Sequence, residues 1–348
     1  MRPTVFPFPR STCVILFGLF ITAQALASQA GWRQLNVPGV APGAAPIPVA
    51  LYYPTQAPAR QIPMGPFTVN VAIQSPPEAS FKGLIVISHG TGGTELGHTS
   101  LAQALAQHGY LVAALRHTGD NWQDRSLLQT SSANYLAQRP QQVSRVIDAL
   151  LSNPQWADRI AKDAKGPRIG VLGHSAGGYT ALALAGAQPD PTRMAAHCAS
   201  HRGDDPIFCS VGRSTPLSSP AAAPSSPIAA MPPLRDNRVR AAVVLAPMAV
   251  VFSAQSLAAI RIPTAIYDAE LDRFLVPRFH ADWVAKNAPD AQRRQISNAS
   301  HFAFMDTANM PIGSEDGDIS ANPPGFDRQA FLQQLGLELP AFFDKAFN

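Results

Sequence analysis

The sequence predicts an α/β domain in which a mostly parallel central sheet is covered by helices on both faces. From Lys82 onward, short and fully apolar runs alternate with segments of helical periodicity. Such runs are typical of strands buried on both faces, and the helices between them supply the right-handed crossovers that parallel strands need. One run also leads through a glycine-bounded serine straight into a helical segment, a junction typical of such sheets.

The elements follow in order along the chain. After a loop over 39–46, two half-buried strands at 47–53 and 67–73 are expected to form an antiparallel edge. The buried strands are predicted at 84–88, 111–115, 169–172, 241–245 and 264–267, with a further strand at 294–296. Helices are predicted at 99–108, 141–151 and 179–185.

The first 27 residues are predicted to be a signal peptide for export. Arg2 and Arg10 precede an apolar run over 13–21, and small residues follow at 25–27, where a signal peptidase would cut. The run is shorter than the ~20 residues that a bilayer-spanning helix needs. An uncleaved membrane anchor or a buried helix is the alternative. Residues 28–348 then form one α/β domain with no other segment able to cross a membrane.

The composition points away from nucleic acid as a partner. A net charge of +4, an isoelectric point near 9.1 and 14% charged residues describe a mildly basic protein. The sequence lacks a cluster of lysine and arginine with interleaved aromatic residues, which is the usual mark of nucleic-acid binding. Ordinary solubility accounts for this charge.

Residues 188–237 interrupt the alternation and are predicted to be an insertion after the helix that follows the serine. Periodicity is weak there, and the stretch from Thr215 to Pro233 is dense in Pro, Ser and Ala. An insertion at this place would lie over a pocket at the strand ends as a lid. The alternative is a surface excursion without a catalytic role.

Two cysteines, Cys198 and Cys209, lie in this insertion. An even number of cysteines in an exported domain favours one disulfide. The alternative is a zinc site made by His197, Cys198, His201 and Cys209, but their spacing matches no common zinc pattern. We therefore expect a Cys198–Cys209 disulfide and no metal.

The segment from Gly173 to Gly177, with the sequence GHSAG, fits the G-x-S-x-G pattern of a nucleophile elbow. It follows the strand at 169–172 and precedes a helix rich in small residues, so the serine stands at the apex of a sharp turn. The glycines are needed because a Cβ two residues to either side would collide with backbone. Ser175 is therefore the predicted nucleophile.

A serine hydroxyl needs a histidine base, and the histidine needs an orienting carboxylate. With this elbow, the acid and then the histidine are expected on loops after later strands. The strand at 264–267 is followed by Asp268, Glu270 and Asp272. Asp272 is favoured because it lies far enough round the turn to reach a histidine on the next loop, and Asp268 is the fallback.

Two histidines come after that acidic loop, His280 and His301. His280 lies in a segment with a helical pattern and is expected to pack or to face solvent. His301 lies in the loop after the strand at 294–296 and is the predicted base.

Acyl transfer also needs hydrogen-bond donors for the oxyanion. The glycine-rich turn at 89–93 directly follows the strand at 84–88, where the second donor is expected. The predicted donors are the backbone N–H groups of Thr91 and of Ala176.

These residues resemble the α/β-hydrolase superfamily, and within it the branch similar to dienelactone hydrolases and platelet-activating-factor acetylhydrolases. The matching stretches, which span most of residues 82–305, are 88–93, 116–121, 139–150, 173–178 and the loops of Asp272 and His301. The resemblance implies the α/β-hydrolase fold, a triad of Ser175, Asp272 and His301, oxyanion donors near Thr91 and Ala176, and carboxylic ester substrates. Two departures are that Ser175 replaces the cysteine of true dienelactone hydrolases, and that Gln141 or Gln142 replaces a usual aspartate.

The sequence thus predicts an exported serine esterase that acts on small-molecule esters and needs no cofactor or metal. A serine peptidase of the prolyl-oligopeptidase type shares this core, but such enzymes carry a large N-terminal propeller, for which only the residues between Ala27 and Lys82 are available. A hydrolase fold kept as a non-catalytic binding module would not need a nucleophile, an acid and a base in register.

Overall fold

A computed structural model describes residues 1, 4, 28–41, 43–210, 231–314 and 317–348. The segment predicted to be a signal peptide and most of the Pro-rich part of the insertion lie outside the described residues. Among the helices that are described, none has the length and apolar character needed to cross a bilayer.

The described chain is built around a 10-stranded sheet with the order β12-β11-β10-β9-β5-β6-β2-β1-β4-β3. Its strands are β1 (Gln29–Val37), β2 (Ile47–Thr55), β3 (Arg60–Met64), β4 (Phe67–Ile73), β5 (Leu84–Ser88), β6 (Leu111–Leu115), β9 (Ile169–His174), β10 (Val239–Leu245), β11 (Thr264–Ala269) and β12 (Gln292–Ile296). Two small hairpins lie outside it, β7 (Lys162–Asp163) with β8 (Gly166–Pro167) and β13 (Gly313–Ser314) with β14 (Gly317–Asp318).

The half of the sheet that carries the elbow is parallel. Neighbouring strands from β6 through β5, β9, β10 and β11 to β12 all pair in parallel. On the other side β2 pairs antiparallel with both β6 and β1, β1 pairs in parallel with β4, and β3 at the edge pairs antiparallel with β4. The predicted mostly parallel sheet with an antiparallel edge is therefore confirmed.

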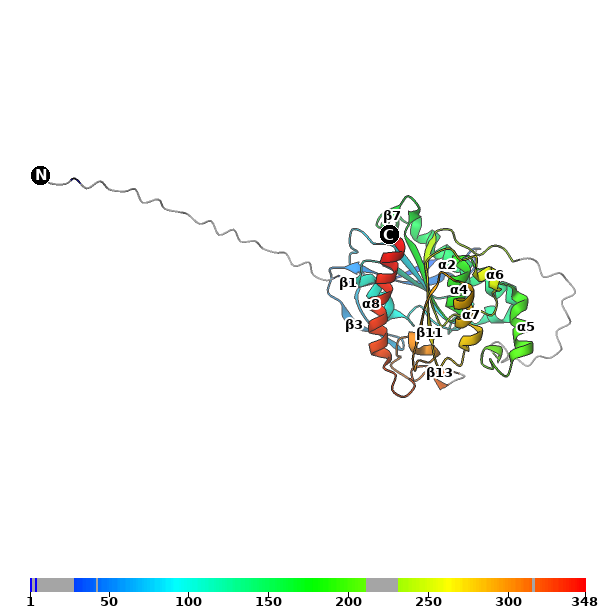
Figure 1. Ribbon diagram of the computed structural model, residues 1–348. Helices are drawn as coiled ribbons and strands as arrows, with labels where there is room; N and C mark the ends of the chain where they lie inside the picture. The colour runs from blue at the N-terminus through cyan, green and yellow to red at the C-terminus, as the bar shows by residue number, and fades with distance from the viewer. Residues whose placement is uncertain (2–3, 5–27, 42, 211–230, 315–316) are drawn as a thin grey trace.

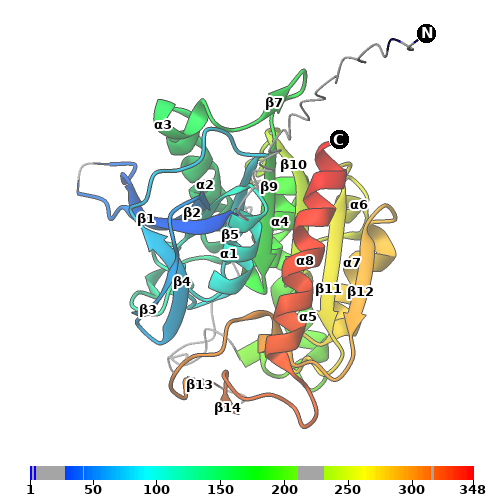
Figure 2. The same ribbon diagram turned by 90° about the vertical axis from the view of Figure 1, so that its left-hand side faces the viewer.

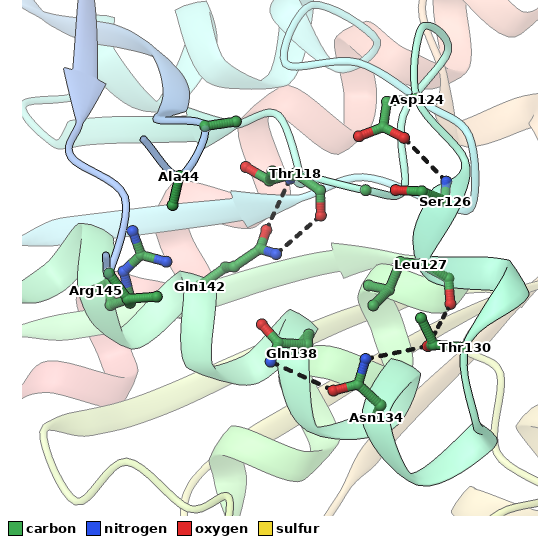
Figure 3. A pocket seen from close by; sticks show the side chains of 13 residues that line it. Ala44, Thr118, Asp124, Ser126, Leu127, Thr130, Asn134, Gln138, Gln142 and Arg145 are labelled. Atoms are coloured by element: carbon green, nitrogen blue, oxygen red, sulfur yellow. Dashed lines mark hydrogen bonds between the residues drawn. The ribbon is translucent and has the colours of Figure 1, made fainter. Parts of the chain in front are cut away.

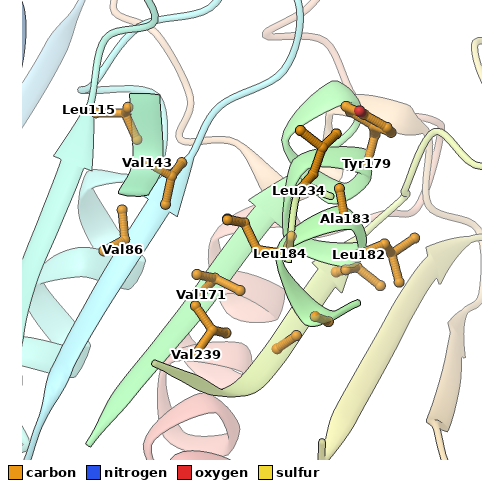
Figure 4. Close-up of a cluster of buried hydrophobic side chains, with 14 of the residues drawn as sticks. Val86, Leu115, Val143, Val171, Tyr179, Leu182, Ala183, Leu184, Leu234 and Val239 are labelled. Carbon is orange, nitrogen blue, oxygen red and sulfur yellow. The ribbon is translucent and has the colours of Figure 1, made fainter. Parts of the chain in front are cut away.

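Helices cover both faces of the sheet (Figures 1 and 2). On one face lie α1 (Thr99–Gln107) and α8 (Arg328–Phe347), and on the other lie α2 (Ser132–Leu151), α4 (Ala176–Ala185) and α7 (Ala281–Asn287). Figure 4 shows the second face, where Val86 and Val171 of the sheet lie near Val143 of α2 and Leu184 of α4. Both predicted helix layers are thus present, and short helices α3 (Pro154–Ala157) and α6 (Ala254–Leu257) complete the loops.

Two helices depart from the sequence prediction. Helix α2 begins at Ser132, because the side chain of Ser131 accepts a hydrogen bond from the N–H of Asn134, and it continues through Pro140. Within the insertion, α5 (Pro191–His201) forms where only irregular structure was predicted. Its start combines two helix-initiating features, an Asp190 side chain that accepts from the N–H of Thr192 and a proline at the first position.

Candidate active site

Ser175 lies between β9 and α4 in a strained backbone conformation, with φ 57° and ψ −117°. Both of its backbone groups are held by the neighbouring strand and its loop. Its N–H donates to the carbonyl of Leu245 at 2.9 Å, and its carbonyl accepts from the N–H of Met248 at 3.0 Å. Backbone strain of this kind persists only where the surroundings fix it, and it is common at functional sites. The predicted elbow is therefore present as a rigid turn.

The glycines around the elbow are required by close backbone contacts. A Cβ at Gly173 would lie 1.9 Å from the carbonyl oxygen of Gly177, and a Cβ at Gly177 would lie 1.8 Å from that of Ser88. These are the predicted collisions with backbone. Because these two positions are glycines, α4 can start directly against the ends of β9 and β5, with Ser175 at the junction.

His301 and Asp272 meet beside the elbow. Nδ1 of His301 lies 2.7 Å from Oδ2 of Asp272, and both side chains are buried. An ionised carboxylate only accepts hydrogen bonds, so Nδ1 of His301 carries the proton and Nε2 keeps its lone pair. His174 is the residue before Ser175, and its Nε2 lies 3.0 Å from the carbonyl oxygen of His301. The two loops and the elbow are therefore joined at one end of the sheet.

The surrounding loop orients this histidine and carboxylate. The second oxygen of Asp272 accepts from the N–H groups of Phe274 at 2.9 Å and Leu275 at 2.8 Å. The ring of Phe274 stacks on that of His301, with centroids 5.1 Å apart and planes 17° apart. A tight turn thus presents one carboxylate oxygen to its own backbone and the other to His301.

The other candidate acids and the other histidine are engaged elsewhere. Asp268 lies in β11 and binds the guanidinium of Arg293 on β12. Glu270 accepts from the N–H of Asn298 at 2.8 Å. His280 was expected either to pack in the interior or to face solvent, and the structure buries it. Its Nε2 lies 3.0 Å from Oδ2 of Asp205.

The glycine-rich turn after β5 lies against the elbow. A Cβ at Gly90 would be 3.2 Å from the Cβ of Ser175. The N–H groups of Gly92 and Gly93 are used within the protein, by Asp120 at 2.9 Å and by the carbonyl of Gly90 at 3.1 Å. The N–H of Thr91 stays the predicted donor of the turn. Ala176 is the first residue of α4, and N–H groups at a helix start have no intrahelical acceptor.

Behind the turn lies a buried polar network whose roles the sequence analysis did not assign. Asp120 and Arg139 form an ion pair with both side chains fully buried, and Tyr135 donates to Asp120 at 2.9 Å. Burial lowers the pKa of His89 to about 4 and that of His117 well below its ordinary value, with the charge of Arg139 acting in the same direction. Asp120 and Arg139 lie in stretches that carry the family resemblance, but only burial identifies them as a pair.

Gln142 is one of the two residues, with Gln141, that stand where the resemblance leads one to expect an aspartate. Its Oε1 accepts from the N–H of Thr118 at 2.9 Å, and its Nε2 donates to the carbonyl of Thr118 at 3.0 Å (Figure 3). Oε1 of Gln142 also lies 3.1 Å from Nδ1 of His117. A neutral amide therefore holds a neutral histidine there. Gln142 and Thr118 also line a groove of about 320 Å³ that includes neither Ser175 nor His301.

The insertion is held together by contacts among its own residues. Cys198 and Cys209 form a disulfide, so the two thiolates that a zinc site would need are already used. The other two residues of the zinc alternative contact carboxylates: Nε2 of His197 lies 2.8 Å from Asp205, and Nδ1 of His201 lies 3.4 Å from Asp204. Within the described residues no group of three or more side chains is arranged to hold a metal ion.

Comparison with known proteins identifies relatives at the level of sequence. The Hydrolase_4 family, described as serine aminopeptidase, matches residues 79–207. Two cutinases of Thermobifida alba, est2 and est1, are 33% and 32% identical to this chain over 118 residues. That match covers 34% of this chain and 35% of each cutinase, so the chain spans about a third of the length of these relatives.

Solved structures share the fold across almost the whole chain. A ferulic acid esterase from Streptomyces cinnamoneus superposes with a TM-score of 0.58 at 19% identity, covering 93% of this chain and 91% of the esterase. A dienelactone hydrolase from Anabaena variabilis superposes with a TM-score of 0.51 at 14% identity, covering 92% of this chain and 100% of the hydrolase. At these identities the likeness establishes the shared fold.

Proposed function

We propose that this chain is a member of the α/β-hydrolase superfamily and an exported serine hydrolase that cleaves carboxylic esters. The observation that carries the proposal is the 2.7 Å contact between Nδ1 of His301 and Oδ2 of Asp272, beside a strained Ser175. That contact fixes the tautomer in which Nε2 of His301 can accept a proton.

The proposed reaction uses Ser175, His301 and Asp272 in two stages. Oγ of Ser175 attacks the ester carbonyl while its proton passes to Nε2 of His301, and the carbonyl oxygen becomes an oxyanion held by the N–H groups of Thr91 and Ala176. Collapse breaks the bond to the alcohol oxygen, which takes the proton from His301. Water then attacks the acyl-enzyme in the same way and releases the acid. Throughout, Asp272 stabilises the imidazolium form of His301.

Export is the second part of the proposal. Arg2, Arg10 and the apolar run at 13–21 have the composition of a signal peptide. The Cys198–Cys209 disulfide supports it, because such bonds persist in oxidising compartments.

Ester substrates are favoured over peptides by the names of the relatives, which are cutinases, a ferulic acid esterase and a dienelactone hydrolase. A serine peptidase is the second candidate, because the family that matches residues 79–207 is described as serine aminopeptidase. The two candidates differ in the leaving group, an alcohol or an amine, at the same nucleophile.

The test combines a fluorophosphonate probe with two matched substrate series. We expect the probe to label Ser175, and p-nitrophenyl esters of graded acyl length to be hydrolysed far faster than aminoacyl p-nitroanilides. The Ser175→Ala variant should lose the label and at least 99% of the ester turnover, since removing a triad member costs on the order of 10⁴-fold. Faster hydrolysis of the anilides would identify a peptidase, and a wild-type protein that takes no label would identify a binding module.

A further inference from the structure

The turn that carries Thr91 is fixed at both ends by one buried ion pair. Oδ1 of Asp120 accepts from the N–H of Gly92 at 2.9 Å, and Nη2 of Arg139 donates to the carbonyl of His89. Asp120 and Arg139 bind each other, and their side chains are 0% exposed. The ion pair of Asp120 and Arg139, called the clamp below, thus holds backbone groups on both sides of Thr91.

The side chain of Thr91 is tied to the same pair. Oγ1 of Thr91 lies 3.0 Å from the hydroxyl of Tyr135, and that hydroxyl donates to Oδ2 of Asp120 at 2.9 Å. Since Tyr135 gives its only proton to Asp120, Thr91 donates to Tyr135. One chain of hydrogen bonds therefore runs from Thr91 through Tyr135 to Asp120.

Arg139 also reaches the helix that carries the other candidate donor. Its Nε donates to Oγ1 of Thr180 at 3.2 Å, and Oγ1 of Thr180 donates to the carbonyl of Ala176 at 3.0 Å. Arg139 thus contacts the turn of Thr91 with one nitrogen and, with another, Thr180, whose hydroxyl binds the first residue of α4. Because its guanidinium is planar and rigid, it sets the spacing between the two segments.

Burying a pair of charges to hold a loop costs desolvation free energy. Removing two charges from water costs several kcal/mol per ion, and apolar residues of the same volume are often as stable or more so. The sheet is already packed on both faces by apolar side chains. The contacts of Asp120 and Arg139 instead converge on α4 and on the turn at 89–93, called the oxyanion turn below. This convergence indicates a role in the geometry of the site.

We propose that Arg139 and Asp120 are positioning residues for the oxyanion site: they fix the N–H groups of Thr91 and Ala176 at the spacing that the reaction needs. The proposal rests on the serine-hydrolase function proposed above. Neither residue touches the substrate; they act through the backbone of residues 89–92 and the start of α4. Their effect should therefore fall on the transition state, where charge develops on the oxygen.

Arg328 provides a matched control. It is 1% exposed and is held, like Arg139, by hydrogen bonds from its guanidinium to backbone carbonyls, those of Ile319 at 2.9 Å and Ala321 at 2.7 Å. It holds a loop before α8. The variants Arg139→Met and Arg328→Met therefore make the same chemical change at two fully buried sites, only one of which clamps the oxyanion turn.

The experiment measures kcat and KM for a p-nitrophenyl ester and the second-order rate of fluorophosphonate labelling at Ser175. We expect Arg139→Met to lower kcat and the labelling rate by roughly 10- to 100-fold, less than the loss of a whole oxyanion donor. Its KM should stay within about threefold of the wild-type value, because the oxyanion forms after binding. Arg328→Met should change both rates by less than about threefold.

Because Arg139→Met leaves the charge of Asp120 buried without its partner, the double variant Asp120→Asn, Arg139→Met is made as well; its core is neutral and is expected to fold. Thermal unfolding verifies that each variant is folded at the assay temperature. A folded double variant with wild-type kcat and labelling rate would overturn the proposal, as would equal losses in Arg139→Met and Arg328→Met. If wild type takes the probe but hydrolyses no ester, the ester function fails, and the labelling rates of the variants still decide the role of Arg139.

Discussion

The guanidinium of Arg293 holds Asp268 through two parallel hydrogen bonds, Nε to Oδ1 and Nη2 to Oδ2, each 2.8 Å long. Nε2 of Gln295 adds a third at 3.2 Å. Asp268 is thus engaged by β12, whereas Asp272 lies round the turn against His301. Asp272, which the sequence favours, and Asp268, the fallback, therefore have different partners.

The first prediction follows from that difference. Asp272→Asn should lower kcat by roughly 10⁴-fold, because the amide cannot hold His301 in the required tautomer. Asp268→Asn should lower kcat by less than about tenfold, since it alters only contacts with Arg293 and Gln295 of β12. Steady-state kinetics on a p-nitrophenyl ester measure both. A larger loss in Asp268→Asn than in Asp272→Asn would move the orienting acid to Asp268.

Much of this geometry could be predicted because it depends on local patterns. The elbow around Ser175 is a strand, a glycine-bounded turn and a helix in one continuous segment, and fully apolar runs mark the parallel strands. The order of acid and histidine after the elbow then left few residues to choose among. The structure places His301 against Asp272 and away from Asp268.

The remaining features depend on contacts between distant segments. The clamp behind Thr91 joins Asp120 to Arg139, 19 positions apart, and nothing local marks either as buried. Strand β1 has adjacent polar residues, Arg33 and Gln34, which break the alternation typical of a strand, and its pairing with β2 identifies it. Helix α5 begins at Asp190 and Pro191, a start signal that the weak periodicity of the insertion obscured.

The second prediction concerns acid stability. His89, His98, His117 and His174 are at most 3% exposed. Burial lowers the pKa of all four, to about 4 for His89 and about 3 for His98. In the unfolded chain these groups take up protons near pH 6.5. Their contribution to stability is therefore complete above pH 6.5 and is lost as the pH falls toward 4, by roughly 3 kcal/mol for His89 alone.

One acid acts in the opposite direction. Burial raises the pKa of Asp306 to about 6, so this group adds stability as the pH falls below 6. The stability gained from this one group does not offset the stability lost from the four histidines. Urea unfolding at pH 7.5, 6.5, 5.5 and 4.5 should therefore show a falling free energy of unfolding below pH 6.5. A value that stays level or rises over this range would contradict the assignment of these histidines as neutral.

The third prediction concerns the disulfide. Reduction of Cys198–Cys209 opens a loop with a sequence separation of 11 residues, worth about 3 kcal/mol on chain-entropy grounds. Because the bond lies in the insertion and outside the sheet, reduction should loosen the insertion more than it lowers global stability. Intact mass of the protein without residues 1–27, which include Cys13, should show no added alkyl group after alkylation without reductant; two added groups would mean that the bond is absent. Ester chain-length profiles before and after reduction then test the lid. An unchanged profile would favour a surface excursion.

The fourth prediction concerns the carboxylate that joins the insertion to the domain. Oδ2 of Asp205 lies 2.8 Å from Nε2 of His197 on α5 and 3.0 Å from Nε2 of His280. Nδ1 of His280 accepts from the N–H of Ala249 at 3.1 Å, so its Nε2 carries the proton and donates to Asp205. The N–H of the preceding residue, Met248, donates to the carbonyl of Ser175. A chain of contacts thus links the insertion to the elbow.

Asp205→Ala should leave two histidine donors without their acceptor, one of them fully buried, and lower the free energy of unfolding by roughly 2–4 kcal/mol. The adjacent Asp204 is the matched control: its side chain is 53% exposed where it pairs with Arg278, and Asp204→Ala should cost less than about 1 kcal/mol. Urea unfolding compares the two variants. If the insertion shapes the site, Asp205→Ala should also shift the ester chain-length preference, and Asp204→Ala should not. Equal losses of stability in both variants would mean that Asp205 is not the anchor.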